Sequence, residues 1–174
     1  EVPGYNAHER DIAPVLDRVF AEAPRRIIVA SFASHIHRVQ QVLDVAVAHR
    51  RKVAFVGRSM VRNMGIARDL GYLTIPEGLV MNLKEIKKLP DDKIALVSTG
   101  SQGEPMAALA RMANRDHRFV EIVPGDTVIV SASPIPGNEE YVARTIDNLF
   151  KVGANVYYHA IKRAHVSGHA SQEE

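Results

Sequence analysis

The chain has 174 residues, 46% of them hydrophobic, which is enough for one domain with a sizeable core. Its formal net charge of +2 excludes a general polycation, so a nucleic-acid interface would need a local basic patch. The lack of cysteine excludes disulfides and thiolate metal sites, and no apolar run has the length of a membrane span, so we expect a cytoplasmic protein without membrane contact.

The first half of the chain alternates between helical and strand-like patterns. In chain order, the expected elements are a turn at 2–6, a helix at 7–23, a strand at 27–30, a helix at 35–49, a strand at 53–56 and a helix at 60–70. Pro14 either kinks the first helix or marks its start, Ser34 is expected to cap the second, and Gly71 is expected to close the third. The apolar positions that the second helix is expected to bury are Ile36, Val39, Leu43 and Val47.

The second half continues the alternation. The expected elements are a short strand at 73–75, a helix at 83–88 capped by Asn82, a strand at 94–98, a glycine-rich turn at 99–103, a helix from Pro105 to Asn114, a strand at 127–131, a helix from its cap Asn138 to Val152, and a strand at 155–158 after Gly153. Strands that alternate with helices predict an α/β fold, a three-layer, doubly wound, mostly parallel sheet with helices on both faces. We expect residues 1–174 to form a single domain.

Polar residues and glycines follow the predicted strands where their carboxyl ends should meet. They include Ser31, Ser34 and Arg38 after the first strand, Arg58 after the second, Gly100 and Ser101 after the third, and Ser131 and Ser133 after the fourth. In a doubly wound sheet, ligands bind in the crevice beyond these ends, where helix N-termini add partial positive charge. The pattern therefore predicts a crevice for an anion, most simply phosphate. Taken one by one, the same residues could equally be helix caps, turn glycines and solvated surface arginines.

A second polar stretch closes the chain. It consists of His165, Val166, Ser167, Gly168, His169, Ala170 and Ser171. Its small residues, hydroxyls and imidazoles suit a loop that holds an anion, with one histidine able to move a proton near neutral pH. The alternative is a polar chain end without a specific role. Because His35 and His37 would point in different directions on a helix, the sequence predicts no complete zinc site of its own.

Three segments together resemble the ribonuclease J family, and more narrowly its β-CASP domain: residues 31–41, 98–105 and 165–171. The resemblance covers essentially the whole chain. It implies part of a zinc-dependent nuclease that acts on RNA as a 5′-to-3′ exonuclease and as an endonuclease in RNA maturation and decay. The His-x-His-x-Asp-His zinc motif of the family is absent. Residue 1 is Glu, not Met, which also suggests a segment of a longer chain. Because the zinc motif is absent, we expect this segment to be inactive alone and to bind no zinc itself.

The resemblance also implies roles for individual residues. His169 matches the histidine beside the zinc centre, which helps to protonate the leaving oxygen. The run from His165 to Ser171 matches the pocket for RNA phosphate, including a 5′-monophosphate. A segment that lines the RNA channel is matched by Ser31, Ser34, Arg38, Arg58 and Ser101. The implied partners are single-stranded RNA, a metallo-β-lactamase domain of the same chain, and further copies in a homo-oligomer.

Two other classes of function stay open. One is a nucleotide-binding domain of a small-molecule enzyme, with Gly100 and Gly103 in a phosphate loop, although their spacing fits neither Gly-x-Gly-x-x-Gly nor a P-loop. The other is a module that only binds partner proteins. Phe32 could stack on a base, but a buried phenylalanine is the more common outcome.

Overall fold

The computed structural model describes the backbone of residues 2–158 and the side chains of residues 12–158. It has one sheet of five strands in the order β2-β3-β1-β4-β5, and every neighbouring pair is parallel. The strands are β1 (Ile27–Ala30), β2 (Lys52–Val56), β3 (Ile94–Ser98), β4 (Thr127–Val130) and β5 (Asn155–Tyr158). All five lie where the sequence pattern predicts a strand, within one residue at each end.

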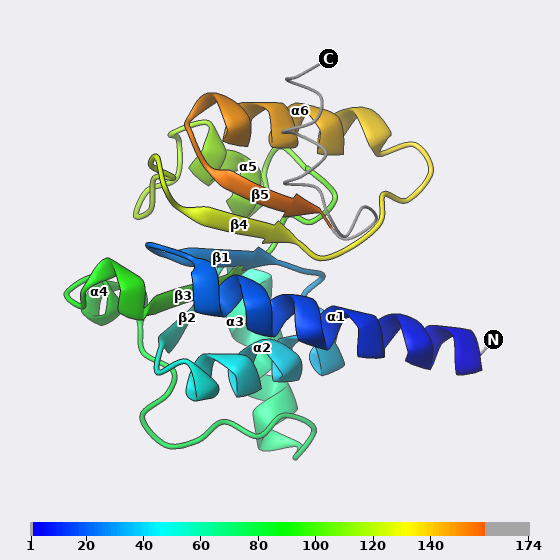
Figure 1. Cartoon of the computed structure of the whole chain (residues 1–174), viewed down its shortest axis with the longest axis vertical. Helices are drawn as coiled ribbons and strands as arrows, with labels where there is room; N and C mark the ends of the chain where they lie inside the picture. The colour runs from blue at the N-terminus through cyan, green and yellow to red at the C-terminus, as the bar shows by residue number, and fades with distance from the viewer. Residues whose placement is uncertain (1, 159–174) are drawn as a thin grey trace.

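Helices cover both faces of the sheet, so the predicted three-layer α/β fold is confirmed (Figure 1). One face carries α1 (Val2–Glu22), α2 (Ile36–Ala48) and α3 (Arg58–Asp69), and the other carries α4 (Leu83–Ile86), α5 (Ala108–Ala113) and α6 (Glu139–Lys151). Alternate strand residues serve the two cores: in β1, Val29 packs with α1–α3 and Ile28 with α4–α6. Because the central strands are buried on both faces, they are continuous apolar runs.

Several helix ends differ from the prediction. The turn expected at 2–6 is wrong, because α1 begins at Val2; Pro3 is compatible with a first helical turn, where its missing N–H has no intrahelical acceptor. Ser34 is not the cap of α2. His35 holds that position, and its Nδ1 accepts a hydrogen bond from the backbone N–H of Arg38 at 3.1 Å. The helix buries Val39, Val42, Leu43 and Ala46, whereas Val47 is 48% exposed.

Three further expectations about loops are corrected. Residues 73–75 form no strand, although Val80 makes an isolated parallel bridge with Val53. Pro105 lies before α5, which begins at Ala108 instead. The backbone N–H of Ala108 donates to the Thr99 hydroxyl at 3.1 Å. Asn138 holds the predicted cap position of α6 but makes no side-chain cap bond; its side-chain amide nitrogen donates to Gln102 Oε1 at 3.2 Å. The predicted cap Asn82 is confirmed, with Oδ1 accepting from Glu85 N at 2.8 Å.

Arginines at the amino-terminal edge of the sheet hold the strands together. Arg26 pairs with the fully buried Asp126 at 2.5 Å, and the same carboxylate accepts from Val123 N. Arg51 is 4% exposed and donates to the backbone oxygens of Ala23, Arg25 and Ile94. These side chains therefore have structural partners that satisfy them. No helix within residues 2–158 has both the length and the hydropathy of a membrane span.

Candidate functional site

The connections of the sheet open a crevice at its carboxyl edge. After β1 the chain turns to α2 on one face, and after the neighbouring β3 it turns to α5 on the other face. Since the two loops diverge, the space between them stays open, which is the usual ligand position in doubly wound sheets. The structure thus places the expected crevice between β1 and β3.

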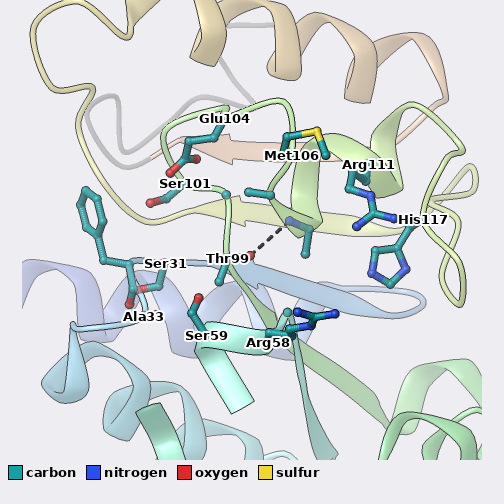
Figure 2. Close-up of a pocket in the computed structure, with 15 residues that line it drawn as sticks. Ser31, Ala33, Arg58, Ser59, Thr99, Ser101, Glu104, Met106, Arg111 and His117 are labelled. Atoms are coloured by element: carbon teal, nitrogen blue, oxygen red, sulfur yellow. Dashed lines mark hydrogen bonds between the residues drawn. The ribbon is translucent and has the colours of Figure 1, made fainter. Parts of the chain in front are cut away.

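A cavity of about 580 Å³ occupies this position (Figure 2). Its walls come from the ends of β1, β2 and β3 and from the region of α5. The lining residues are Ser31, Phe32, Ala33, Gly57, Arg58, Ser59, Thr99, Gly100, Ser101, Glu104, Met106, Ala107, Ala108, Arg111 and His117. Segments far apart in the sequence therefore meet in one hollow. We call it the strand-end cavity.

The loop after β3 forms one wall and is held tightly. Gly100 has φ +108°, and a Cβ there would lie 2.8 Å from the Cβ of Leu109, so this position needs glycine for the turn itself. Ser101 is 2% exposed, and its hydroxyl has no hydrogen-bond partner within the described residues. Gln102 ties the loop to the segment after β4, donating to Ser133 O at 2.9 Å and accepting from Ile135 N at 2.7 Å. The loop thus places a buried hydroxyl without a partner among the described residues at the wall of the cavity.

The start of α3 forms the opposite wall. Gly57 holds the N-cap position, so no side chain caps the helix, and its first turn contains no acidic residue. Arg58 and Ser59 follow directly and line the cavity. Uncapped N–H groups at a helix start carry partial positive charge and favour an anion.

His117 and Arg111 close the cavity beside α5 (Figure 2). His117 Nδ1 accepts hydrogen bonds from the backbone N–H groups of Phe119 at 3.1 Å and Val120 at 3.2 Å. In the neutral ring, the proton therefore sits on Nε2, which is left as a donor. Partial burial, reinforced by the charge of Arg111, lowers the pKa of His117 and so favours the neutral ring.

The charges of the cavity suit an anion. Within residues 12–158, neither Arg58 nor Arg111 has a carboxylate partner, in contrast to the paired Arg25 and Arg26 at the other edge of the sheet. Glu104 is the one carboxylate among the lining residues, and it accepts a hydrogen bond from the Gln102 backbone N–H at 3.2 Å. The cavity can thus hold a phosphate with two guanidinium groups, hydroxyls and a helix start.

The structure brings four of the predicted site residues together: Ser31, Arg58, Gly100 and Ser101 all line the strand-end cavity. Ser34 is exposed and lines a separate shallow hollow beside Phe32. Arg38 does not line the cavity. It is buried, and its guanidinium donates to Gln41 Oε1 at 2.8 Å and to the hydroxyl of Ser131. It lies at the same edge of the sheet and joins α2 to the end of β4.

The predicted residues of the closing run lie outside the described residues. They are His165, Val166, Ser167, Gly168, His169 and Ser171. Conversely, sequence reasoning missed Arg111 and His117. The sequence could have pointed to Arg111, because it is the one charged residue of the otherwise apolar helix α5. A lone charge on an apolar helix is expected where the helix borders solvent or a ligand. His117 lies in an irregular polar segment and carried no such signal. Residues 12–158 contain no group of three or more metal-ligating side chains.

Comparisons with known proteins identify the family of the chain. The model of the "Ribonuclease J, beta-CASP domain" family matches residues 24–149. Ribonuclease J of Thermus thermophilus is 52% identical over 174 residues, which cover 100% of this chain and 30% of that protein. Ribonuclease J of Mycolicibacterium smegmatis is 51% identical over 98% of this chain and 30% of its own length, and the Synechocystis protein is 51% identical over 100% and 27%. The chain thus spans under a third of these relatives, and it belongs to the ribonuclease J family as its β-CASP domain.

Proposed function

We propose that this chain is the RNA-binding part of a zinc-dependent ribonuclease that acts in RNA maturation and decay, by 5′-to-3′ exonuclease and endonuclease action. One observation carries the proposal: the strand-end cavity holds two arginines without carboxylate partners among the described residues, Arg58 and Arg111. Family membership supplies the class of substrate, since the relatives are named ribonucleases. The physical reading of the cavity as a phosphate site agrees with that class.

Phosphate groups are the part of RNA that this cavity suits. Each guanidinium group can donate two parallel hydrogen bonds to two oxygens of one phosphate. The Ser101 hydroxyl and the backbone N–H groups at the start of α3 can donate to the remaining oxygens. Such contacts grip the backbone of any sequence, and they release counterions, so affinity falls as salt rises. Single-stranded RNA fits better than a duplex, because its backbone can bend into a cavity.

Catalysis belongs to the parent enzyme in this proposal. The described residues hold no cluster that would fit zinc, so they are assigned binding and positioning of RNA, and zinc would supply the hydrolytic chemistry elsewhere in the parent. His169, which matches the family's histidine beside the zinc centre, is proposed to protonate the leaving oxygen. The run 165–171 is proposed to hold a 5′-monophosphate. We further propose contact with a metallo-β-lactamase domain of the same chain, a homo-oligomeric parent and a cytoplasmic location.

The test measures binding of a fluorescent, 5′-monophosphorylated oligoribonucleotide to the 174-residue chain by anisotropy at several salt concentrations. Arg111→Gln should weaken binding and reduce the slope of log affinity against log salt by about 0.7, the value for one lost phosphate contact on a single strand. Arg68→Gln is the matched control, because Arg68 is exposed, lies outside the cavity and pairs with Asp69. Equal slopes for both variants would refute the cavity as the phosphate site.

The same titration separates the competing functions. ATP or NAD that displaces the RNA at micromolar concentration would favour a nucleotide-binding domain with Gly100 and Gly103 at the phosphates. A chain that binds neither RNA nor nucleotide at low salt would favour a module that only binds proteins.

A further inference from the structure

A second hollow adjoins the strand-end cavity. It measures about 720 Å³ and shares Gly57, Arg58, Arg111 and His117 with the cavity, so the two lie side by side. Its other walls come from β2, α3, the start of α4 and the segment after α5. Those residues are Phe55, Val56, Val61, Arg62, Asn82, Leu83, Lys84, Arg118 and Phe119. We call it the lateral groove.

The lateral groove is more basic than the cavity. Five cationic side chains line it, and no aspartate or glutamate does: Arg58, Arg62, Lys84, Arg111 and Arg118. None of the five forms an ion pair within residues 12–158. Other exposed cations of the same region do: Arg68 pairs with Asp69 at 3.4 Å, and Lys88 with Glu85 at 3.5 Å. Solvated surface arginines are common, but five such cations without carboxylates around one hollow indicate an anionic ligand.

An aromatic ring stands on the wall of the groove. Phe119 is 46% exposed, which is unusual for a phenylalanine, and its ring meets the His117 ring edge-on at 6.3 Å between centroids. Its backbone is fixed at both ends, because its N–H donates to His117 Nδ1 at 3.1 Å and its carbonyl accepts from Lys87 Nζ at 2.7 Å. The Arg118 guanidinium lies 5.4 Å from the ring centroid. A fixed, exposed ring among cations is the combination that binds single-stranded nucleic acid, through stacked bases and paired phosphates.

We propose that the lateral groove binds a second stretch of the RNA strand that occupies the strand-end cavity, with phosphates on Arg62, Lys84 and Arg118 and a base stacked on Phe119. This inference rests on the proposed function, since it extends the same substrate. Because the two hollows share four lining residues, one strand can reach from the cavity into the groove. An acidic peptide would use the cations, but it would give the exposed ring no stacking partner.

The test compares two oligoribonucleotides of about four and about twelve nucleotides, a short and a long footprint within the range of single-strand-binding domains. The double variant Arg62→Glu, Lys84→Glu removes groove cations from α3 and α4. The control is Arg68→Glu, Lys88→Glu, which changes the same two helical regions and the net charge by the same amount but lines neither hollow. Both double variants should stay folded, because all four side chains are exposed.

The groove variant should bind the longer RNA about tenfold more weakly than the control, and the shorter RNA about equally, because only the longer strand reaches the groove. Phe119→Leu, which keeps apolar bulk but removes the flat ring, should weaken the longer RNA by about fivefold or more. The groove assignment is overturned if the longer RNA binds no better than the shorter one, or if both double variants lose affinity equally. It is also overturned if poly-glutamate binds in the groove and RNA does not. Loss of binding in Arg111→Gln, with no effect of the groove variants, would leave the proposed function standing without this extension.

Discussion

Gly103 should be the position where one added methyl group does most damage to the site. It follows Gln102 in the loop after β3 and has φ +76°, a conformation that L-residues rarely adopt. A Cβ built there would lie 2.3 Å from the backbone oxygen of Tyr141 and 2.7 Å from the backbone nitrogen of Val142. These atoms belong to the first turn of α6 and cannot rotate away. Either the loop or the helix must move.

The size of the effect follows from two costs. The positive φ alone costs an alanine about 1 kcal/mol. Forcing loop and helix apart adds a packing cost of about 1–3 kcal/mol, so we expect Gly103→Ala to lower the free energy of unfolding by about 2–4 kcal/mol. Gly78→Ala is the matched control, since Gly78 has φ +82° and no atom within 4 Å of its added Cβ. It should lose about 1 kcal/mol.

Urea unfolding followed by circular dichroism measures both free energies. RNA affinity gives a second readout, because a displaced loop moves Ser101 and Glu104 in the strand-end cavity. We therefore expect Gly103→Ala to weaken RNA binding at temperatures where the variant is still folded, and Gly78→Ala to leave it unchanged. If the two variants lose equal stability, within about 0.5 kcal/mol, the close approach of loop and helix has no energetic weight and the reasoning is wrong.

Two further predictions concern histidines. Burial lowers the pKa of His117 below its ordinary value of 6.5. As the pH falls, the imidazole is therefore protonated in the unfolded chain before it is protonated in the folded chain. The free energy of unfolding should thus decline below about pH 6.5. His117→Asn keeps an acceptor for the Phe119 and Val120 N–H groups and should flatten that decline in urea titrations; an unchanged pH profile would contradict the assignment. In the full-length parent enzyme, His169→Ala should cut turnover by about 100-fold and leave RNA affinity largely intact, measured by single-turnover cleavage and anisotropy. A fully active variant would remove His169 from the chemistry.

Sequence patterns predicted the sheet well because its three central strands are buried on both faces. A short β-branched run between polar turns, such as residues 27–30, has few other ways to bury its side chains. Helix starts were harder. Ser34 and His35 can both cap α2, and only the path of the chain after β1 decides between them. The start of α5 depends on Thr99, a residue nine positions earlier, which no local pattern reveals.

The carboxyl edge of the sheet was predicted as the site, but the roles of its arginines were not. Arg38 and Arg58 both follow strands of the sheet and were both predicted to line the crevice. The structure buries Arg38 against Ser131 and leaves Arg58 exposed in the strand-end cavity. The difference lies in where each helix begins relative to its strand. β1 is followed by a loop of five residues before α2, whereas α3 starts one residue after Gly57.

The distribution of ion pairs separates structural arginines from ligand-binding ones. At the amino edge, Arg26 and Arg51 are satisfied by a buried carboxylate and by backbone carbonyls, so changing them would cost stability first. At the carboxyl edge, Arg58 and Arg111 have no carboxylate partner within the described residues, so their charge adds little to the fold. The positive charge of an arginine without a carboxylate partner is not neutralised locally and can attract an anionic ligand. This asymmetry between the two edges of one sheet is the physical reason to look for phosphate at only one of them.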